Sequence, residues 1–181
     1  MTAPTRPSYT PVAMILHWLI ALLILINFGI GLTLDRALDF ISRDQVLFYH
    51  ASIGSLVFML AVLRLVWRLT HRPPALPASV SPWQARAAHT AHWTLYILML
   101  VVPLTGYLHR LAGGHSVSFF GIAMLPVLID KDLPLRLLTH TLHTSLVWLL
   151  AGVVFVHLAA VLKHQLIDRD GLLARMLPFK R

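Results

Sequence analysis

Residues 137–162 read LLTHTLHTSLVWLLAGVVFVHLAAVL, a stretch without a single Asp, Glu, Lys or Arg. About 20 such residues are enough for a helix to cross the hydrocarbon core of a bilayer. Within the stretch lie His143 and His157. Polar side chains inside a membrane span are costly and usually functional. The stretch therefore predicts a transmembrane helix that carries two functional histidines.

Three more uncharged windows of the required length occur earlier in the chain, at residues 7–34, 45–63 and 87–109. Each of them predicts a further span. The four expected helices cover approximately residues 12–34, 47–69, 89–110 and 138–164. The fold class that follows is all-α, an integral membrane four-helix transmembrane bundle, with residues 1–181 forming a single membrane domain.

The uncharged window at residues 111–129 is expected to be a loop rather than a fifth span. It contains several glycines, serines and a proline, which are typical of loops. We expect an ordered loop over residues 111–136, with a short interfacial helix at residues 118–125.

The composition supports a membrane protein and directs attention to histidine. Hydrophobic residues make up 57% of the chain and charged residues only 12%, about half the charged fraction of a soluble domain. The absence of cysteine excludes disulfides, thiolate-bound iron–sulfur clusters and covalent haem attachment through C-x-x-C-H. The chain has 11 histidines and no glutamate, so histidine is the main candidate metal ligand.

The distribution of Lys and Arg predicts the orientation in the membrane. With four spans, both termini share one side, and ten of the 15 cations fall there. They are Arg6, Arg64, Arg68, Arg72, Arg86, Lys163, Arg169, Arg175, Lys180 and Arg181. The other side receives Arg36, Arg43, Arg110, Lys131 and Arg136. We therefore expect cytoplasmic termini and a periplasmic 111–136 loop, and we interpret the net charge of +8 through this rule rather than through nucleic acid.

Four histidines inside the spans pair by depth. His17, early in the first helix, and His157, late in the fourth, lie toward the cytoplasmic side. His50 and His143 lie near the starts of helices that begin at the periplasmic side. A lone intramembrane histidine is more often a helix–helix contact, but pairing at two depths favours metal ligation.

The interval between His143 and His157 sharpens this interpretation. At 3.6 residues per turn, 14 residues return to within roughly 40° of the same helix face, about 21 Å further along. Imidazole is the usual axial ligand of b-type haem. The sequence therefore predicts two haems b, with irons held by His17 and His157 on the cytoplasmic side and by His50 and His143 on the periplasmic side.

Other residues are candidates for the surroundings of these haems. Arg64 lies 14 residues after His50, which would bring it to the level of the cytoplasmic haem as a partner for a propionate; the alternative is snorkelling to the interface. Gly54 and Gly152 would leave room for a flat ring. His89 and His92 are expected near the cytoplasmic haem, and His140 near the periplasmic haem.

The order and spacing of several short segments resemble the prokaryotic cytochrome b561 family over nearly the whole chain. The segments are LHW (16–18), HASIG (50–54), RLVWRL (64–69), PP (73–74), AHTAH (88–92), LVVPLTG (100–106) and DGLLARMLP (170–178). The resemblance implies a four-helix bundle with two haem b groups on His17, His157, His50 and His143. It also implies a quinone-linked electron carrier of the bacterial inner membrane.

One branch of that family oxidises superoxide at the outer face and reduces ubiquinone. On this basis we expect electrons to pass between a quinone and a periplasmic partner, either superoxide or a redox protein. Lys131, Arg136 and His140 would attract an anion, although Asp130 and Asp132 lie beside them. The quinone could bind at the cytoplasmic end, near Arg68, Arg72 and His89, or at the 111–136 loop.

Two other functions stay open at this point. The chain could be a cytochrome subunit that anchors a periplasmic oxidoreductase, as in hydrogenases and formate dehydrogenases. It could also be a histidine-rich metal transporter without haem, although the lack of acidic residues within the spans argues against this. The sequence leaves the oligomeric state undetermined, a homodimer included.

Overall fold

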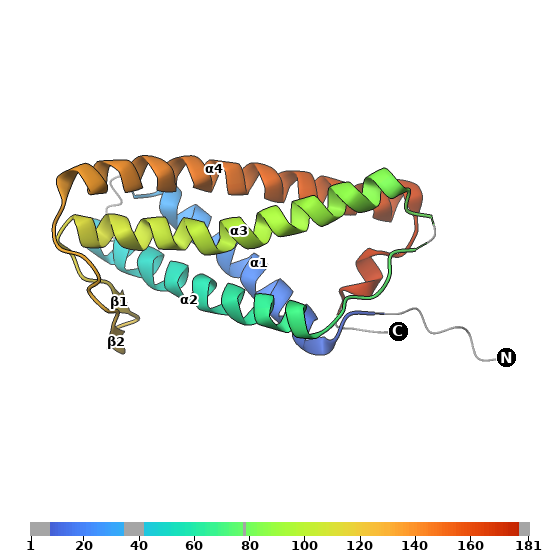
Figure 1. Ribbon diagram of the computed structural model, residues 1–181, viewed down its shortest axis with the longest axis horizontal. Coiled ribbons are helices and arrows are strands. Elements are labelled where there is room, and N and C mark those ends of the chain that lie inside the picture. Colours follow the sequence, from blue (N-terminus) through green and yellow to red (C-terminus); the bar gives the residue numbers. More distant parts are fainter. Residues whose placement is uncertain (1–7, 35–41, 78, 178–181) are drawn as a thin grey trace.

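The computed structural model describes residues 8–34, 42–77 and 79–177. Within these ranges, four helices are long and apolar enough to cross a membrane. They are α1 (Pro11–Leu32), α2 (Arg43–Thr70), α3 (Pro82–Ala112) and α4 (Leu133–Lys163). The helices run side by side along one long axis (Figure 1). The expected all-α architecture of four long apolar helices is thereby confirmed.

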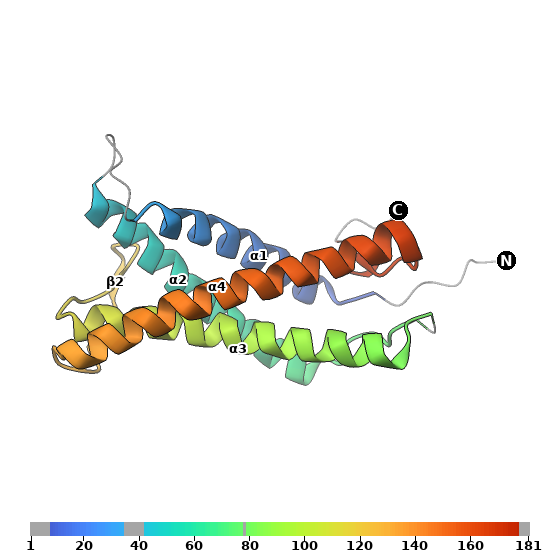
Figure 2. The ribbon, with the colours of Figure 1, turned by 90° about the horizontal axis from the view of Figure 1, so that it is seen from above.

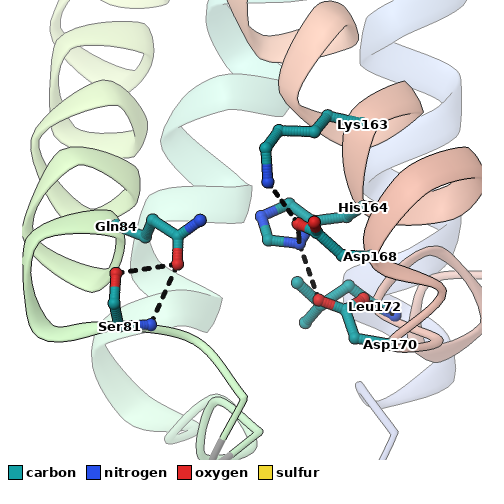
Figure 3. Close-up of polar contacts among 7 residues, drawn as sticks. All are labelled: Ser81, Gln84, Lys163, His164, Asp168, Asp170 and Leu172. Carbon is teal, nitrogen blue, oxygen red and sulfur yellow. Dashed lines mark hydrogen bonds and ion pairs between the residues drawn. The ribbon is translucent and has the colours of Figure 1, made fainter.

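Helices α2, α3 and α4 begin several residues before the expected positions, because their capping residues lie outside the uncharged windows. At the start of α3, the Ser81 backbone N–H and hydroxyl both donate to Gln84 Oε1, at 2.9 and 2.8 Å (Figure 3). Pro82 then occupies the first turn, where its missing N–H costs nothing. At the start of α4, Asp132 accepts from the Leu135 N–H at 2.9 Å. His89 and His92 consequently lie inside α3 rather than at its start.

The helices pack most closely as α3 with α4, α1 with α2, and α2 with α3. Seen from above, α4 runs diagonally over the other helices (Figure 2). Two apolar clusters form the core in the described part of the chain. One joins α1, α2 and α3 and contains Ile20, Ala61, Tyr96 and Met99; the other joins α3 and α4 and contains Leu98, Val102 and Leu150.

Large apolar side chains also cover the outside of the bundle. Phe155 is 73% exposed and Val156 is 62% exposed, both within the apolar stretch of α4. In water such a surface would be unfavourable, whereas in a bilayer these side chains would contact the lipid chains. This distribution agrees with a multi-pass membrane protein.

The segment between α3 and α4 contains a two-stranded hairpin and not the expected short helix at residues 118–125. Strand β1 (Ser118–Phe119) pairs antiparallel with β2 (Ala123–Met124). Phe120 and Gly121 connect the strands with φ of 51° and 75°. A right-handed helix cannot contain two such residues, so the glycine at 121 allows the turn instead.

The two ends of the bundle are distinct, and we call them the terminal end and the loop end. At the terminal end, the Tyr9 N–H donates to the Arg175 carbonyl at 3.2 Å, and Trp18 Nε1 donates to the Met176 carbonyl at 2.8 Å. The loop end carries the β1–β2 hairpin (Figure 1). Four cations of the charge count, Arg6, Arg36, Lys180 and Arg181, lie outside the described residues.

Candidate functional site

At the loop end, His50 of α2 faces His143 of α4. Their ring centroids are 6.2 Å apart and their planes are nearly perpendicular, at 89°. His50 Nδ1 lies 3.2 Å from the Asn27 carbonyl of α1, and His143 Nδ1 lies 2.9 Å from the Val102 carbonyl of α3. All four helices therefore contribute to this loop-end pair.

At the terminal end, His17 of α1 faces His157 of α4. Their ring centroids are 6.3 Å apart at an interplanar angle of 81°. This terminal-end pair and the loop-end pair lie about 21 Å apart along α4, because 14 residues at about 1.5 Å per residue separate His143 from His157. The structure thus brings together both histidine couples that were expected from the sequence.

The spacing within each couple fits a metal between two imidazoles. A metal–imidazole nitrogen bond is about 2 Å long and the ring centre lies about 1 Å further on, so two imidazoles on opposite sides of one metal have centres about 6 Å apart. The measured distances are 6.2 and 6.3 Å. Both couples also join helices that are not among the most closely packed pairs, as a group inserted between them would require.

The hydrogen bonds of the loop-end pair suit metal binding. A backbone carbonyl only accepts, so the Nδ1 atoms of His50 and His143 are the donors in these bonds. In each ring Nε2 then keeps its lone pair for a metal, the arrangement that metal-binding histidines usually have. A side chain at position 106 would crowd this pair, since a Cβ there would lie only 2.9 Å from His143 Cε1.

The terminal-end pair is held by a side chain instead. Arg64 NH1 lies 2.8 Å from His17 Nδ1, and Arg64 Nε donates to the Tyr96 hydroxyl at 3.2 Å. A guanidinium only donates, so His17 Nδ1 is the acceptor here. Arg64 therefore points into the bundle at the level of His17, where the 14-residue interval from His50 put it.

Of the two candidates on α3, only His92 joins the terminal-end pair. Its ring centroid lies 5.7 Å from that of His157, at an interplanar angle of 63°. His89 is exposed and accepts a hydrogen bond from Trp93 Nε1 at 3.0 Å, on its own helix. The rings of His17, His157 and His92 therefore lie together at this level of the bundle.

A cavity of about 260 Å³ adjoins the terminal-end pair. No residue of α4 lines it, so it is separate from the space between His17 and His157. Arg64, Arg68 and Arg72 line it at intervals of four residues along α2 and beyond, while Trp67 and Tyr96 supply aromatic walls. The other lining residues are Ser8, Tyr9, Thr10, Ala13, His71, Pro73, Pro74 and Met176. The cavity combines positive charge with aromatic surface and has no carboxylate in its lining.

The remaining candidates from the sequence lie elsewhere. His140 pairs with His109 of α3 at 5.2 Å between ring centroids, beyond the loop-end pair. A Cβ at Gly54 would make an ordinary contact, 3.5 Å from Asn27 Nδ2. Gly152 is exposed and a Cβ there would meet nothing within 4 Å. It lies nine residues from His143, half a turn round the helix at about 100° per residue, so the structure does not bring Gly152 to either pair.

Sequence reasoning missed the groups that orient the imidazoles. The Asn27 and Val102 carbonyls contact the imidazoles directly, and the Tyr96 hydroxyl holds Arg64, which contacts His17. Every residue has a backbone carbonyl, so the sequence could not indicate the roles of the Asn27 and Val102 carbonyls. Tyr96 did have a signal, because it lies four residues after His92 and so on the same helix face.

A separate cluster of His and Asp side chains lies at the C-terminal end of α4. His164 Nδ1 lies 2.6 Å from Asp170 Oδ2 and 3.1 Å from Asp168 Oδ2. The Lys163 ammonium also pairs with Asp168, at 2.5 Å (Figure 3). These ion pairs hold the π-helical turn His164–Asp168 that follows the helix, and we assign the cluster this structural role.

Four apolar helices that bring intramembrane histidines together in facing couples define the class of histidine-paired membrane electron carriers. Within that class, the family model described as prokaryotic cytochrome b561 matches residues 8–179. The chain belongs to this family. Membership implies haem b as the cofactor and electron transport in a membrane as the role.

Individual relatives support the assignment along almost the whole chain. Cytochrome b561 homolog 2 of Escherichia coli is 32% identical over 176 residues, which cover 96% of this chain and 93% of the relative. Cytochrome b562 of Cereibacter sphaeroides is 30% identical, with 95% and 96% covered. The probable superoxide oxidase CybB of Yersinia pestis is 27% identical, with 92% and 93% covered.

Proposed function

We propose that this protein is a di-haem cytochrome b of the bacterial inner membrane that passes electrons between the quinone pool and a periplasmic partner. His50 and His143 would hold one haem iron, and His17 and His157 the other. The observation that carries the proposal is the spacing of the two couples, 6.2 and 6.3 Å between ring centroids, at opposite ends of one apolar bundle.

When bound, each haem supplies a one-electron redox centre, and the protein supplies ligands, orientation and electrostatics. Two imidazoles on one iron leave no open position for oxygen, which favours electron transfer. At the loop end, the Asn27 and Val102 carbonyls fix the imidazole planes. Ligands held in this way would move little when a bound iron changes its oxidation state, which would keep the reorganisation energy of electron transfer small.

Arg64 would balance the charge of a haem propionate at the terminal end. Its two hydrogen bonds go to neutral groups, His17 Nδ1 and the Tyr96 hydroxyl. A carboxylate is a stronger partner for a guanidinium than either of these. By taking Arg64, it would free His17 Nδ1 to carry the ring proton and donate a hydrogen bond to another acceptor, which leaves the Nε2 lone pair for the iron.

The cavity at the terminal end is our proposed site for the quinone head group. Arg64 both lines this cavity and contacts His17, so a molecule bound there would lie one side chain from a haem ligand. Arg68 and Arg72 offer donors to quinone oxygens, and Trp67 and Tyr96 offer flat apolar surfaces. His89, which points to Trp93, does not line this cavity.

The charges of the described residues support cytoplasmic termini. Seven cations are carried by the helix ends and connections of the terminal end: Arg64, Arg68, Arg72, Arg86, Lys163, Arg169 and Arg175. Four are carried by those of the loop end: Arg43, Arg110, Lys131 and Arg136. Under the positive-inside rule, the quinone cavity would face the cytoplasmic leaflet and the hairpin the periplasm.

Superoxide is our candidate for the periplasmic donor. A relative carries the name probable superoxide oxidase. At the loop end Arg110 Nε is buried and has no hydrogen-bond partner among the described residues, and a small anion would be a suitable one. His109 and His140 lie beside each other at the same end.

The test uses purified protein in liposomes that contain ubiquinone. Stopped-flow spectroscopy should show haem reduction by superoxide well above the uncatalysed rate, followed by quinone-dependent reoxidation. Haem that is reduced only by a co-purifying periplasmic enzyme would favour the anchoring-subunit function instead. A preparation without a haem spectrum after ample haem supply would remove the whole proposal.

A further inference from the structure

The hairpin at the loop end exposes apolar side chains although it lies in a connection between helices. Ile122 is 81% exposed and Met124 61% exposed, and Val127 and Leu128, which follow, are 67% and 62% exposed. No charged residue occurs between Arg110 and Asp130. A connection in water would normally carry polar side chains at such positions, so this surface suits an apolar environment.

Ser52 of α2 fixes the depth of the hairpin along the bundle. Its side chain is fully buried; the hydroxyl donates to the Ser118 carbonyl at 3.0 Å and accepts from the Phe120 N–H at 3.1 Å. Helix α2 has 28 residues, about 42 Å, which exceeds the roughly 30 Å hydrocarbon core by about 6 Å at each end. Ser52 lies nine residues after Arg43, about 13 Å along the helix, and therefore within the hydrocarbon layer.

The backbone N–H groups of the turn also find partners within the protein. Besides the Phe120 N–H, the Gly121 N–H donates to Ser118 Oγ at 3.2 Å, and the Ile122 N–H donates to the Phe119 carbonyl at 2.9 Å. After the turn, the Leu125 N–H donates to the Val117 carbonyl at 2.9 Å. Non-helical backbone survives at membrane depth only when its polar groups find partners within the protein.

A second contact ties the hairpin to α3. The Tyr107 hydroxyl donates to the Pro126 carbonyl. Ser52 on α2 and Tyr107 on α3 thus hold the segment across the line where these two helices meet. Ser52 lies two residues after His50, so the hairpin lies at the level of the loop-end pair.

We propose that residues 118–128 form a re-entrant hairpin inserted into the bilayer, in the leaflet of the loop end, with lipid chains as its partner. It covers the junction of α2 and α3 beside the loop-end pair, which keeps the surroundings of His50 dry. The inference depends on the membrane spans and not on the proposed function, because neither haem nor quinone enters it.

The absence of cysteine allows a direct test. Ile122→Cys introduces a single labelling site at the tip, and Lys131→Cys provides a matched exposed site at the base of the same connection. Both are labelled with an environment-sensitive fluorophore and reconstituted alone in phosphatidylcholine–phosphatidylglycerol liposomes. We expect a blue-shifted emission at residue 122, quenched by spin-labelled lipids and protected from iodide, and the opposite behaviour at residue 131.

Equal access of iodide to both labels would overturn the proposal, and would leave a protein partner as the occupant of the apolar surface. The variant Ser52→Ala in the Ile122→Cys background tests the docking. Loss of the Ser52 hydroxyl leaves the Phe120 N–H without a partner in lipid. The label at residue 122 should therefore move toward water. An unchanged emission would overturn the role of Ser52 in setting the depth.

Discussion

The two histidine pairs have the same spacing but different supports. At the loop end, backbone carbonyls of two neighbouring helices hold both imidazoles. At the terminal end, the Arg64 side chain holds His17, and a third imidazole, His92, lies beside His157. Backbone cannot change its chemistry or swing away, whereas side chains can do both. The loop-end pair is therefore built as a fixed site, and the terminal-end pair as an adaptable one.

Packing is also tighter around the loop-end pair than around the terminal-end pair. A Cβ at Gly31 would lie 3.1 Å from His50 Cε1, and one at Gly106 would lie 2.9 Å from His143 Cε1. The loop-end rings are thus wedged against the backbone of two helices. The terminal-end pair instead adjoins the cavity of about 260 Å³. A site that exchanges electrons with a diffusing quinone needs such space, and a site that only relays them does not.

The largest expected effect is the loss of the loop-end haem. His50→Ala or His143→Ala removes one of the two proposed ligands. Among the described residues, no other imidazole is in ring contact with this pair. We expect the haem content to fall from two to one per chain in the pyridine haemochrome assay. His140→Ala is the matched control, because its ring pairs with His109 and not with His143. An unchanged content in His143→Ala would refute the ligand assignment.

A smaller loss is expected at the terminal end. In His17→Ala, His92 can take the empty position opposite His157, since their centroids already lie 5.7 Å apart. We expect partial retention of this haem with an altered low-spin electron paramagnetic resonance signal. The double variant His17→Ala, His92→Ala should lose it entirely. If His17→Ala alone loses as much haem as His50→Ala, the terminal end is as rigid as the loop end, and the proposed difference between the two ends is wrong.

Gly106→Ala should weaken the loop-end haem without abolishing it. The new methyl group needs space already taken by the His143 ring, and overpacking of this kind costs about 1–3 kcal/mol. Haem transfer to apomyoglobin would measure the faster release. Gly29→Ala serves as the control, because a Cβ there meets nothing within 4 Å. Equal release rates in both variants would show that the His143 ring can move away from the new methyl group at little cost.

Arg64→Met should lower the midpoint potential of the terminal-end haem only. Removing a nearby positive charge favours the oxidised, more positive form of the haem, by about 1 kcal/mol or roughly 40 mV for a screened charge. Arg64→Lys keeps the charge and should shift the potential less. A redox titration that resolves both haems measures the effect. Equal shifts of the two haems would contradict the position of Arg64 beside His17 alone.

The sequence was sufficient for the spans and for the pairing of the histidines, because both depend on quantities that local sequence contains. Charge-free length gives the helices, and the depth of each histidine follows from its distance to a helix end. The helix starts were missed by several residues at Arg43, Pro82 and Leu133, since capping uses polar residues outside the apolar windows. The hairpin was missed because its partner, Ser52, is 66 residues away.

Long-range contacts also explain which parts of the site were not predictable. The Asn27 and Val102 carbonyls orient the loop-end rings through bonds that cross between helices, and helix rotation decides which carbonyl is near. His92 and His89 have the same residue type and lie three positions apart, yet only His92 reaches His157.

The smallest expected effect concerns Gly152, for which sequence and structure lead to opposite expectations. The sequence suggested that Gly152 makes room for a haem, but the residue is exposed and lies half a turn from His143. Gly152→Ala should therefore keep both haems and raise stability by about 0.5–1 kcal/mol, because glycine in a helix interior is less favourable than alanine. Haem content and thermal denaturation in detergent measure the two quantities. Loss of a haem in this variant would mean that α4 is rotated about its axis in the haem-bound protein, so that Gly152 lies on the side of the haem.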